Sequence, residues 1–149
     1  QVPLWKLADV LAPSIALGHV FGRIGCLMNG CCFGLPTSLP WAIHFPPEHF
    51  TQGAGVHPTQ IYEAIGNLAL YAALAWLYRR KGFDGRVFAS YLIAYGALRF
   101  LVEFFRGDYE VRYLGGWATA GHLVSLAVLG CGVGLYQWLR RSDAIAERS

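Results

Sequence analysis

The chain has few charged residues and too few cysteines for a disulfide-rich fold. Of its 149 residues, 14% are charged and 55% are hydrophobic, whereas soluble domains usually carry roughly 25% charged residues. This composition argues against a soluble domain and predicts an all-α, polytopic bundle of transmembrane helices. The four cysteines are few and grouped locally, which argues against a disulfide scaffold. The small net charge of +3 gives nucleic-acid binding little support.

The sequence also lacks internal repeats, low-complexity tracts and any sign of a second, soluble domain. It has no initiator methionine, and Gln1 leads into an apolar segment without the basic start and cleavage site of a signal peptide. We therefore expect residues 1–149 to be a single transmembrane domain and an excerpt or processed product of a longer protein.

Four apolar segments are long enough to cross a bilayer, whose hydrocarbon layer of about 30 Å requires roughly 20 helical residues. They cover residues 7–28, 58–78, 87–105 and 115–139. Most Lys and Arg residues fall before the first segment, between the second and third, and after the fourth. These ends should face the cytoplasm, which predicts a cytoplasmic C-terminus. The connection at about residues 32–57 contains no Lys or Arg and is expected to be an outer, interfacial loop.

Five charged residues interrupt these spans, and each costs about 2.5–3.5 kcal/mol at the centre of a membrane helix. They are Asp9, Arg23, Glu63, Arg99 and Glu103. Asp9 lies near the inner edge and is expected to face water. At a rise of about 1.5 Å per residue, the other four come from three helices but converge in the outer half of the bilayer.

Two interpretations of the four convergent charges remain open. In the first, Arg99 pairs with Glu103 and Arg23 with Glu63, which only holds the bundle together. In the second, the arginines bind an anionic ligand, because guanidinium groups stay charged when buried and hold phosphate with two hydrogen bonds. We favour the second, with a phospholipid as the ligand, because intramembrane charges usually mark functional sites. Tyr95 shares one helix face with Arg99 and Glu103 at i, i+4, i+8 spacing.

Three of the four cysteines lie in the stretch GRIGCLMNGCCFG, residues 22–34. Because this spacing lacks a second pair of ligands, zinc has weak support and no metal site is predicted. Buried free thiols are the favoured interpretation for all four cysteines. A catalytic thiolate at Cys26 or Cys31, activated by Arg23, is the alternative. His57, at the mouth of the second span, is a candidate proton-transfer group, although a lone interfacial histidine more often only forms hydrogen bonds.

The motifs GRIGCLMNGCCFG, HPTQIYEA and YGALRFLVEFFRGD, in this order, resemble those of the bacterial prolipoprotein diacylglyceryl transferases. ADVLAPSIALGHVFGRIG and GHLVSL extend the similarity over nearly the whole chain. The resemblance implies transfer of a diacylglyceryl group from phosphatidylglycerol to the lipobox cysteine of a preprolipoprotein signal peptide. A thioether forms and glycerol phosphate leaves. The resemblance also implies that the protein lies in the bacterial inner membrane, in contact with its lipids, and needs no metal or other cofactor.

The family pattern can be transferred residue by residue. The residues implied for catalysis are Arg23, Tyr95, Arg99 and Glu103, to which His57 is added as the candidate base. The residues implied for substrate binding are Arg23, Asn29, Gly34, Tyr62, Glu63 and Arg99.

Two departures from the family pattern leave alternatives open. Cys26 and Cys31 stand where well-known members have Asn and Glu. An earlier His-Gly-Gly segment is missing, because the resemblance covers only the later half of a usual member. The alternatives are a non-catalytic phospholipid-binding module of the same fold, or a membrane thiol or metal sensor.

Overall fold

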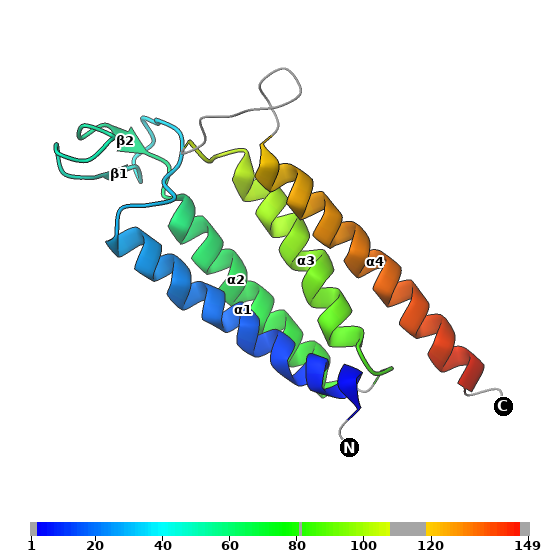
Figure 1. Ribbon diagram of the computed structural model, residues 1–149. Helices are drawn as coiled ribbons and strands as arrows, with labels where there is room; N and C mark the ends of the chain where they lie inside the picture. The colour runs from blue at the N-terminus through cyan, green and yellow to red at the C-terminus, as the bar shows by residue number, and fades with distance from the viewer. Residues whose placement is uncertain (1–2, 81, 108–118, 147–149) are drawn as a thin grey trace.

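The computed structural model describes residues 3–80, 82–107 and 119–146, which form four helices and one short pair of strands (Figure 1). The helices are α1 (Leu4–Met28), α2 (Thr59–Arg79), α3 (Arg86–Glu103) and α4 (Ala120–Ala146). Strands β1 (Ile43–His44) and β2 (Gly55–Val56) are antiparallel. The predicted all-α bundle is confirmed, with helix ends a few residues from those expected. Residues 115–118, the expected start of the fourth span, lie outside the described residues.

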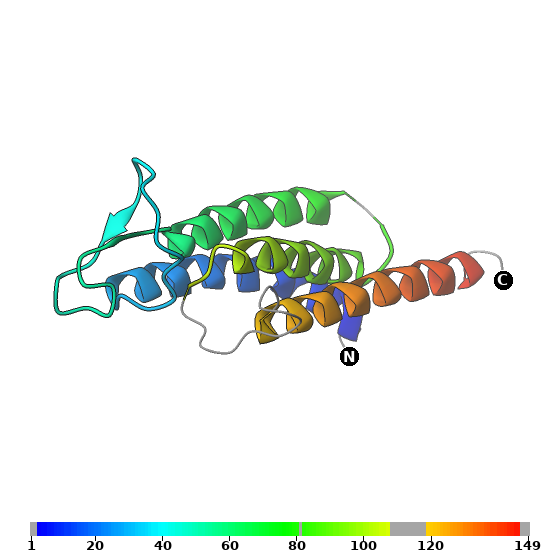
Figure 2. The same cartoon turned by 90° about the horizontal axis from the view of Figure 1, so that it is seen from above.

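Helix α3 is the centre of the bundle, because it contacts each of the other three helices. It packs mainly against α4, while α1 packs mainly against α2, and Figure 2 shows α3 between α2 and α4. The start of α1, the α2–α3 connection and the end of α4 lie at one end of the bundle (Figure 1). The strands lie at the opposite end. Successive helices therefore alternate in direction, as four spans require.

Large apolar side chains are exposed along the outer faces of all four helices, as expected where lipid is the solvent. Examples are Leu4, Val10, Phe21, Ile65, Leu68, Leu101, Leu123 and Val124. By length and composition, α1 and α4 could each cross a membrane. Helix α2 buries the polar residues Gln60, Glu63 and Asn67, and α3 contains three charged residues. Membrane crossing by α2 and α3 therefore stays a prediction.

Asp9 is buried, so the expectation that it faces water is wrong. Its two carboxylate oxygens accept hydrogen bonds from the backbone N–H groups of Gly85 and Phe88, both at 2.8 Å. The first N–H groups of a helix have no partner within the helix, and Asp9 of α1 satisfies two at the start of α3. Gly85 has a φ of 86°, a conformation that favours glycine. This contact joins α1 and α3 at the end opposite the strands.

Candidate functional site

Four charged side chains from three helices form a continuous chain of ion pairs near the end of the bundle that carries the strands. Glu63 of α2 is the central member, because one carboxylate oxygen contacts Arg23 Nε of α1 and the other contacts Arg99 Nη1 of α3. The Glu63–Arg99 distance is 2.5 Å. Arg99 Nη2 lies 2.9 Å from Glu103 Oε2. The predicted convergence of these four residues is confirmed.

Burial differs between the two signs of charge. The side chains of Glu63 and Glu103 are 4% and 0% exposed, whereas those of Arg23 and Arg99 are 17% and 15% exposed. The purely structural interpretation predicted the pairs Arg23–Glu63 and Arg99–Glu103. Both are present, and the Glu63–Arg99 contact links them. Glu63 contacts Arg23 through Nε, and the two terminal nitrogens of Arg23 carry four further N–H donors. The two carboxylates are thus more deeply buried than the two guanidinium groups that they bind.

Helix α4 and the residue before it complete the surroundings of Glu103. The Thr119 hydroxyl donates a hydrogen bond of 2.6 Å to Glu103 Oε1. It also lies 3.1 Å from Nδ1 of the buried His122. A Cβ atom at Gly121 would lie 2.7 Å from Glu103 Oε2 and closer still to Oε1. Sequence reasoning missed Thr119 and Gly121, although GHLVSL was part of the family resemblance.

A layer of aromatic rings lies one helical turn from the two arginines. Tyr95 of α3 stacks on His19 of α1, with ring centroids 4.8 Å apart. His19 precedes Arg23 by four residues and Tyr95 precedes Arg99 by four, so each ring lies on the same helix face as its arginine. Tyr91 extends the stack and its hydroxyl lies 3.2 Å from His19 Nε2. The sequence predicted Tyr95 in this region but gave His19 no role.

Tyr62 and His57, both predicted as site residues, contact each other at the mouth of α2. The Tyr62 hydroxyl lies 3.2 Å from His57 Nδ1 and accepts a hydrogen bond of 2.9 Å from Trp41 Nε1. These three side chains line a groove of about 470 Å³ whose other walls are apolar. The remaining lining residues are Leu39, Leu98, Leu101, Val102 and Phe105. Three of them belong to α3, the helix that carries Arg99.

Gly34, predicted to bind substrate, lies where two backbone segments pass close together. Its N–H donates to the carbonyl of His57 at 2.9 Å. A Cβ atom there would lie 2.5 Å from the Cβ of His57 and 2.7 Å from the carbonyl oxygen of Phe105. No side chain fits, which gives this glycine a packing role whether or not it also meets substrate.

The loop after α1 is anchored by the start of α2. The side chains of Thr59 and Gln60 are buried and donate hydrogen bonds to the carbonyls of Cys32 and Cys31, at 2.6 and 2.7 Å. Sequence reasoning missed both residues. Their only signal was their position inside the motif HPTQIYEA.

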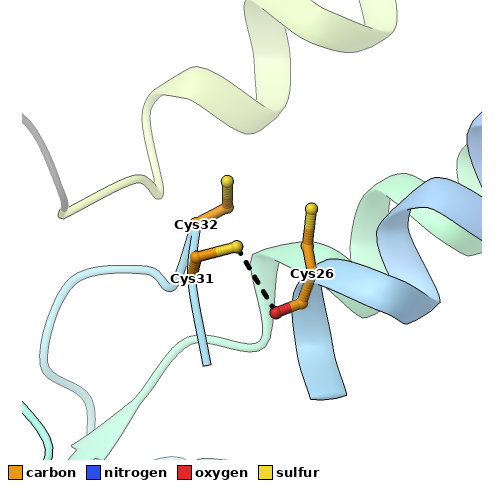
Figure 3. Close-up of side chains that lie close together, drawn as sticks. All are labelled: Cys26, Cys31 and Cys32. Atoms are coloured by element: carbon orange, nitrogen blue, oxygen red, sulfur yellow. Dashed lines mark hydrogen bonds between the residues drawn. The ribbon is translucent and has the colours of Figure 1, made fainter. Parts of the chain in front are cut away.

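The anchored loop brings three cysteines together. The sulfur atoms of Cys26, Cys31 and Cys32 all lie within 4.8 Å of one another (Figure 3). Hydrogen bonding to the side chain of Asn29, an exposed residue predicted to bind substrate, lowers the pKa of Cys31. Burial raises the pKa of Cys32. Asn29 thus lies beside the cysteine cluster.

The prediction that the cysteines are free is confirmed, but the prediction that they are buried is wrong. The three clustered cysteines are only half-buried, and Cys131 is exposed on α4. The reason is that Cys31 and Cys32 lie in a loop beside a cavity and Cys26 lies near the end of α1. Cys131 points out of the bundle, where apolar side chains are expected to meet lipid.

Comparison with known proteins agrees with the motifs. The family model for prolipoprotein diacylglyceryl transferase matches residues 1–138. The chain belongs to this family. It is 46% identical to the phosphatidylglycerol–prolipoprotein diacylglyceryl transferase of Clostridium tetani over 104 residues, which are 69% of this chain and 42% of that protein. The family resemblance expected from the sequence is confirmed.

Two further members of the family match more of the chain. The transferase of the same name from Finegoldia magna is 40% identical over 129 residues, or 86% of this chain and 48% of that protein. That from Sinorhizobium medicae is 40% identical over 152 residues, or 97% of this chain and 53% of that protein. The chain spans about half the length of the curated relatives it matches.

Proposed function

We propose that the protein containing this chain transfers a diacylglyceryl group from phosphatidylglycerol to the lipobox cysteine of a preprolipoprotein. The observation that carries the proposal is the chain of ion pairs, in which two partly exposed arginines are held by two buried glutamates. Membership of the family adds support, because relatives carry the name of this reaction.

In this reaction, the sulfur of the acceptor cysteine attacks the glyceryl carbon that bears the phosphate ester. A carbon–sulfur bond forms, the carbon–oxygen bond breaks, and its electron pair leaves on the oxygen of glycerol phosphate. Arg23 and Arg99 would bind the phosphate and stabilise the negative charge that grows on it, an effect that is strong in a site of low dielectric. Glu63 and Glu103 would orient the two guanidinium groups.

The proton of the attacking thiol requires an acceptor, and His57 is the candidate within this chain. Its Nδ1 contacts the Tyr62 hydroxyl, which would fix the orientation of the ring, as a general base requires. The apolar groove beside this pair would suit an acyl chain. Tyr95 and Asn29, beside the charges and the cysteines respectively, complete the proposed site.

We also propose that the site opens toward the outer face of the bacterial inner membrane and that the C-terminus is cytoplasmic. Lys6 is near the start of α1, Arg86 begins α3 and Arg140 is near the end of α4. These helix ends lie opposite the strands (Figure 1), and short cytoplasmic connections are enriched in Lys and Arg.

Incubation of the purified full-length protein with labelled phosphatidylglycerol and a lipobox peptide tests the proposal. We expect labelled thioether product, and we expect Arg99→Ala to abolish it while the protein remains in the membrane fraction. Arg140→Ala, at an exposed arginine of α4, is the matched control and should retain full activity.

Two outcomes would contradict the proposal. Full transfer by the Arg99→Ala variant would show that Arg99 is not needed to bind the phosphate, which contradicts the role proposed for the arginines. Saturable phosphatidylglycerol binding without any thioether product would instead favour a non-catalytic phospholipid-binding module, in line with the cysteines at positions 26 and 31.

A further inference from the structure

We propose that Cys26, Cys31 and Cys32 form a binding site for one Zn²⁺ ion, with three thiolate ligands and an open fourth position. The linear spacing of these residues gave no such prediction, but the fold brings their sulfur atoms within 4.8 Å of one another. Figure 3 shows the side chain of Cys31 directed toward Cys26, with the sulfur of Cys32 on the same side of the loop. This proposal does not depend on the transfer reaction.

The separation of the sulfur atoms fits a tetrahedral zinc ion after a small contraction. A Zn–S bond of about 2.3 Å places two ligand sulfurs about 3.8 Å apart in tetrahedral geometry. Because the three sulfurs already lie within 4.8 Å, each pair has to close by at most about 1 Å. Rotation about the Cα–Cβ bonds can supply a movement of this size without a change of fold.

The backbone around the cluster is held in a conformation that adjacent cysteines rarely adopt. Cys32 has a φ of 61°, in the left-handed region that costs a non-glycine residue about 1–3 kcal/mol. In an extended chain, Cys31 and Cys32 would point to opposite sides. The buried side chains of Thr59 and Gln60 bind the two cysteine carbonyls and stabilise the turn. The turn thereby keeps both sulfurs near Cys26.

The surroundings provide access and charge balance for the ion. A cavity of about 460 Å³ opens beside Cys31 and Cys32, with room for water as the fourth ligand. His49 lines this cavity, but its two ring nitrogens contact the Gly30 carbonyl and the Thr51 hydroxyl. Three thiolates and Zn²⁺ together carry one negative charge, and the positive charge of Arg106 acts on Cys32. Thiolate ligands also favour Zn²⁺ over Mg²⁺ or Ca²⁺.

Metal binding by the reduced, purified full-length protein tests this site. Zinc content is measured by mass spectrometry after dialysis, and Co²⁺ is used as a spectroscopic probe because thiolate coordination gives intense near-ultraviolet absorption. We expect one metal ion per chain and thiolate-to-cobalt bands. Single substitutions Cys26→Ser, Cys31→Ser and Cys32→Ser should each weaken Co²⁺ binding by more than about 100-fold, since losing a ligand exceeds the 10–100-fold effect of losing an outer partner.

Cys131→Ser is the matched control, because Cys131 is exposed on α4, and it should bind Co²⁺ as the unaltered protein does. Circular dichroism of each variant, measured without metal, checks that the helices remain folded. The site is refuted if the reduced protein binds less than a stoichiometric amount of either ion. It is equally refuted if a folded triple Ser variant still gives the thiolate bands, or if oxygen ligands alone account for the cobalt spectrum.

Discussion

Replacement of Gly121 by alanine tests whether Glu103 is held in one position by the residues around it. A Cβ atom at residue 121 would overlap the Glu103 carboxylate. The end of a glutamate side chain can normally swing away, but Arg99 and Thr119 bind this carboxylate and its side chain is fully buried. The overlap therefore has to be relieved by breaking these contacts or by moving α4.

The expected magnitude follows from opposing effects. Overpacking at a buried site costs about 1–3 kcal/mol, and loss of a hydrogen bond to a charged group costs about 1.5–3 kcal/mol. Alanine is favoured over glycine in a helix by up to about 1 kcal/mol. Gly130→Ala, in the same helix with no atom within 4 Å of the new Cβ, should show only this gain. Because that gain is common to both variants and the overlap is relieved in one way or the other, we expect Gly121→Ala to lower the free energy of unfolding by about 1–3 kcal/mol relative to Gly130→Ala.

Unfolding in detergent micelles, followed by circular dichroism, measures this difference. A second background isolates the cause: in a Glu103→Ala protein the overlap is gone, so Gly121→Ala should cost no more than Gly130→Ala. Equal stability of the two glycine variants in the unaltered protein would refute the reasoning. So would an undiminished cost of Gly121→Ala in the Glu103→Ala background, because non-additivity is the signature of a direct contact.

Three further substitutions test other contacts. Glu63→Gln removes the negative charge shared by two arginines and should lower the free energy of unfolding in detergent by about 3–5 kcal/mol; a loss below about 1 kcal/mol would show that the ion pairs contribute little. Asp9→Asn weakens the cap of α3 and should cost about 1 kcal/mol in the same assay, whereas the exposed control Asp143→Asn should stay within about 0.5 kcal/mol. Tyr62→Phe removes the hydroxyl that contacts His57 and should slow thioether formation by up to about 100-fold, and an unchanged rate would argue against His57 as the base.

The convergence of the charged residues could be predicted because helix geometry is nearly fixed. A constant rise per residue converts sequence position into depth, and the intramembrane cost of charge makes partners necessary. The same reasoning located Arg23, Glu63, Arg99 and Glu103 without any knowledge of packing. It could not show that Glu63 contacts both arginines, because that depends on how the helices rotate about their axes.

Contacts between distant segments were missed for a similar reason. Asp9 binds the N–H of Gly85, 76 residues away, and nothing near Asp9 in the sequence indicates a helix start as its partner. The cysteine cluster depends on the left-handed backbone at Cys32 and on two side chains of α2. Residue spacing alone does not encode these features, so it underestimated how close the thiols lie.

The chain of ion pairs also constrains how the protein is built. Arg23 leaves the ribosome well before Glu63, and Glu63 precedes Arg99 by 36 residues. Until α2 arrives, Arg23 lacks its counterion Glu63, and an unpaired charge inside a membrane helix costs about 2.5–3.5 kcal/mol. Helix α1 is thus more stable beside the insertion machinery than alone in lipid. We expect it to enter the bilayer together with the helices that carry its partners, so that release is cooperative.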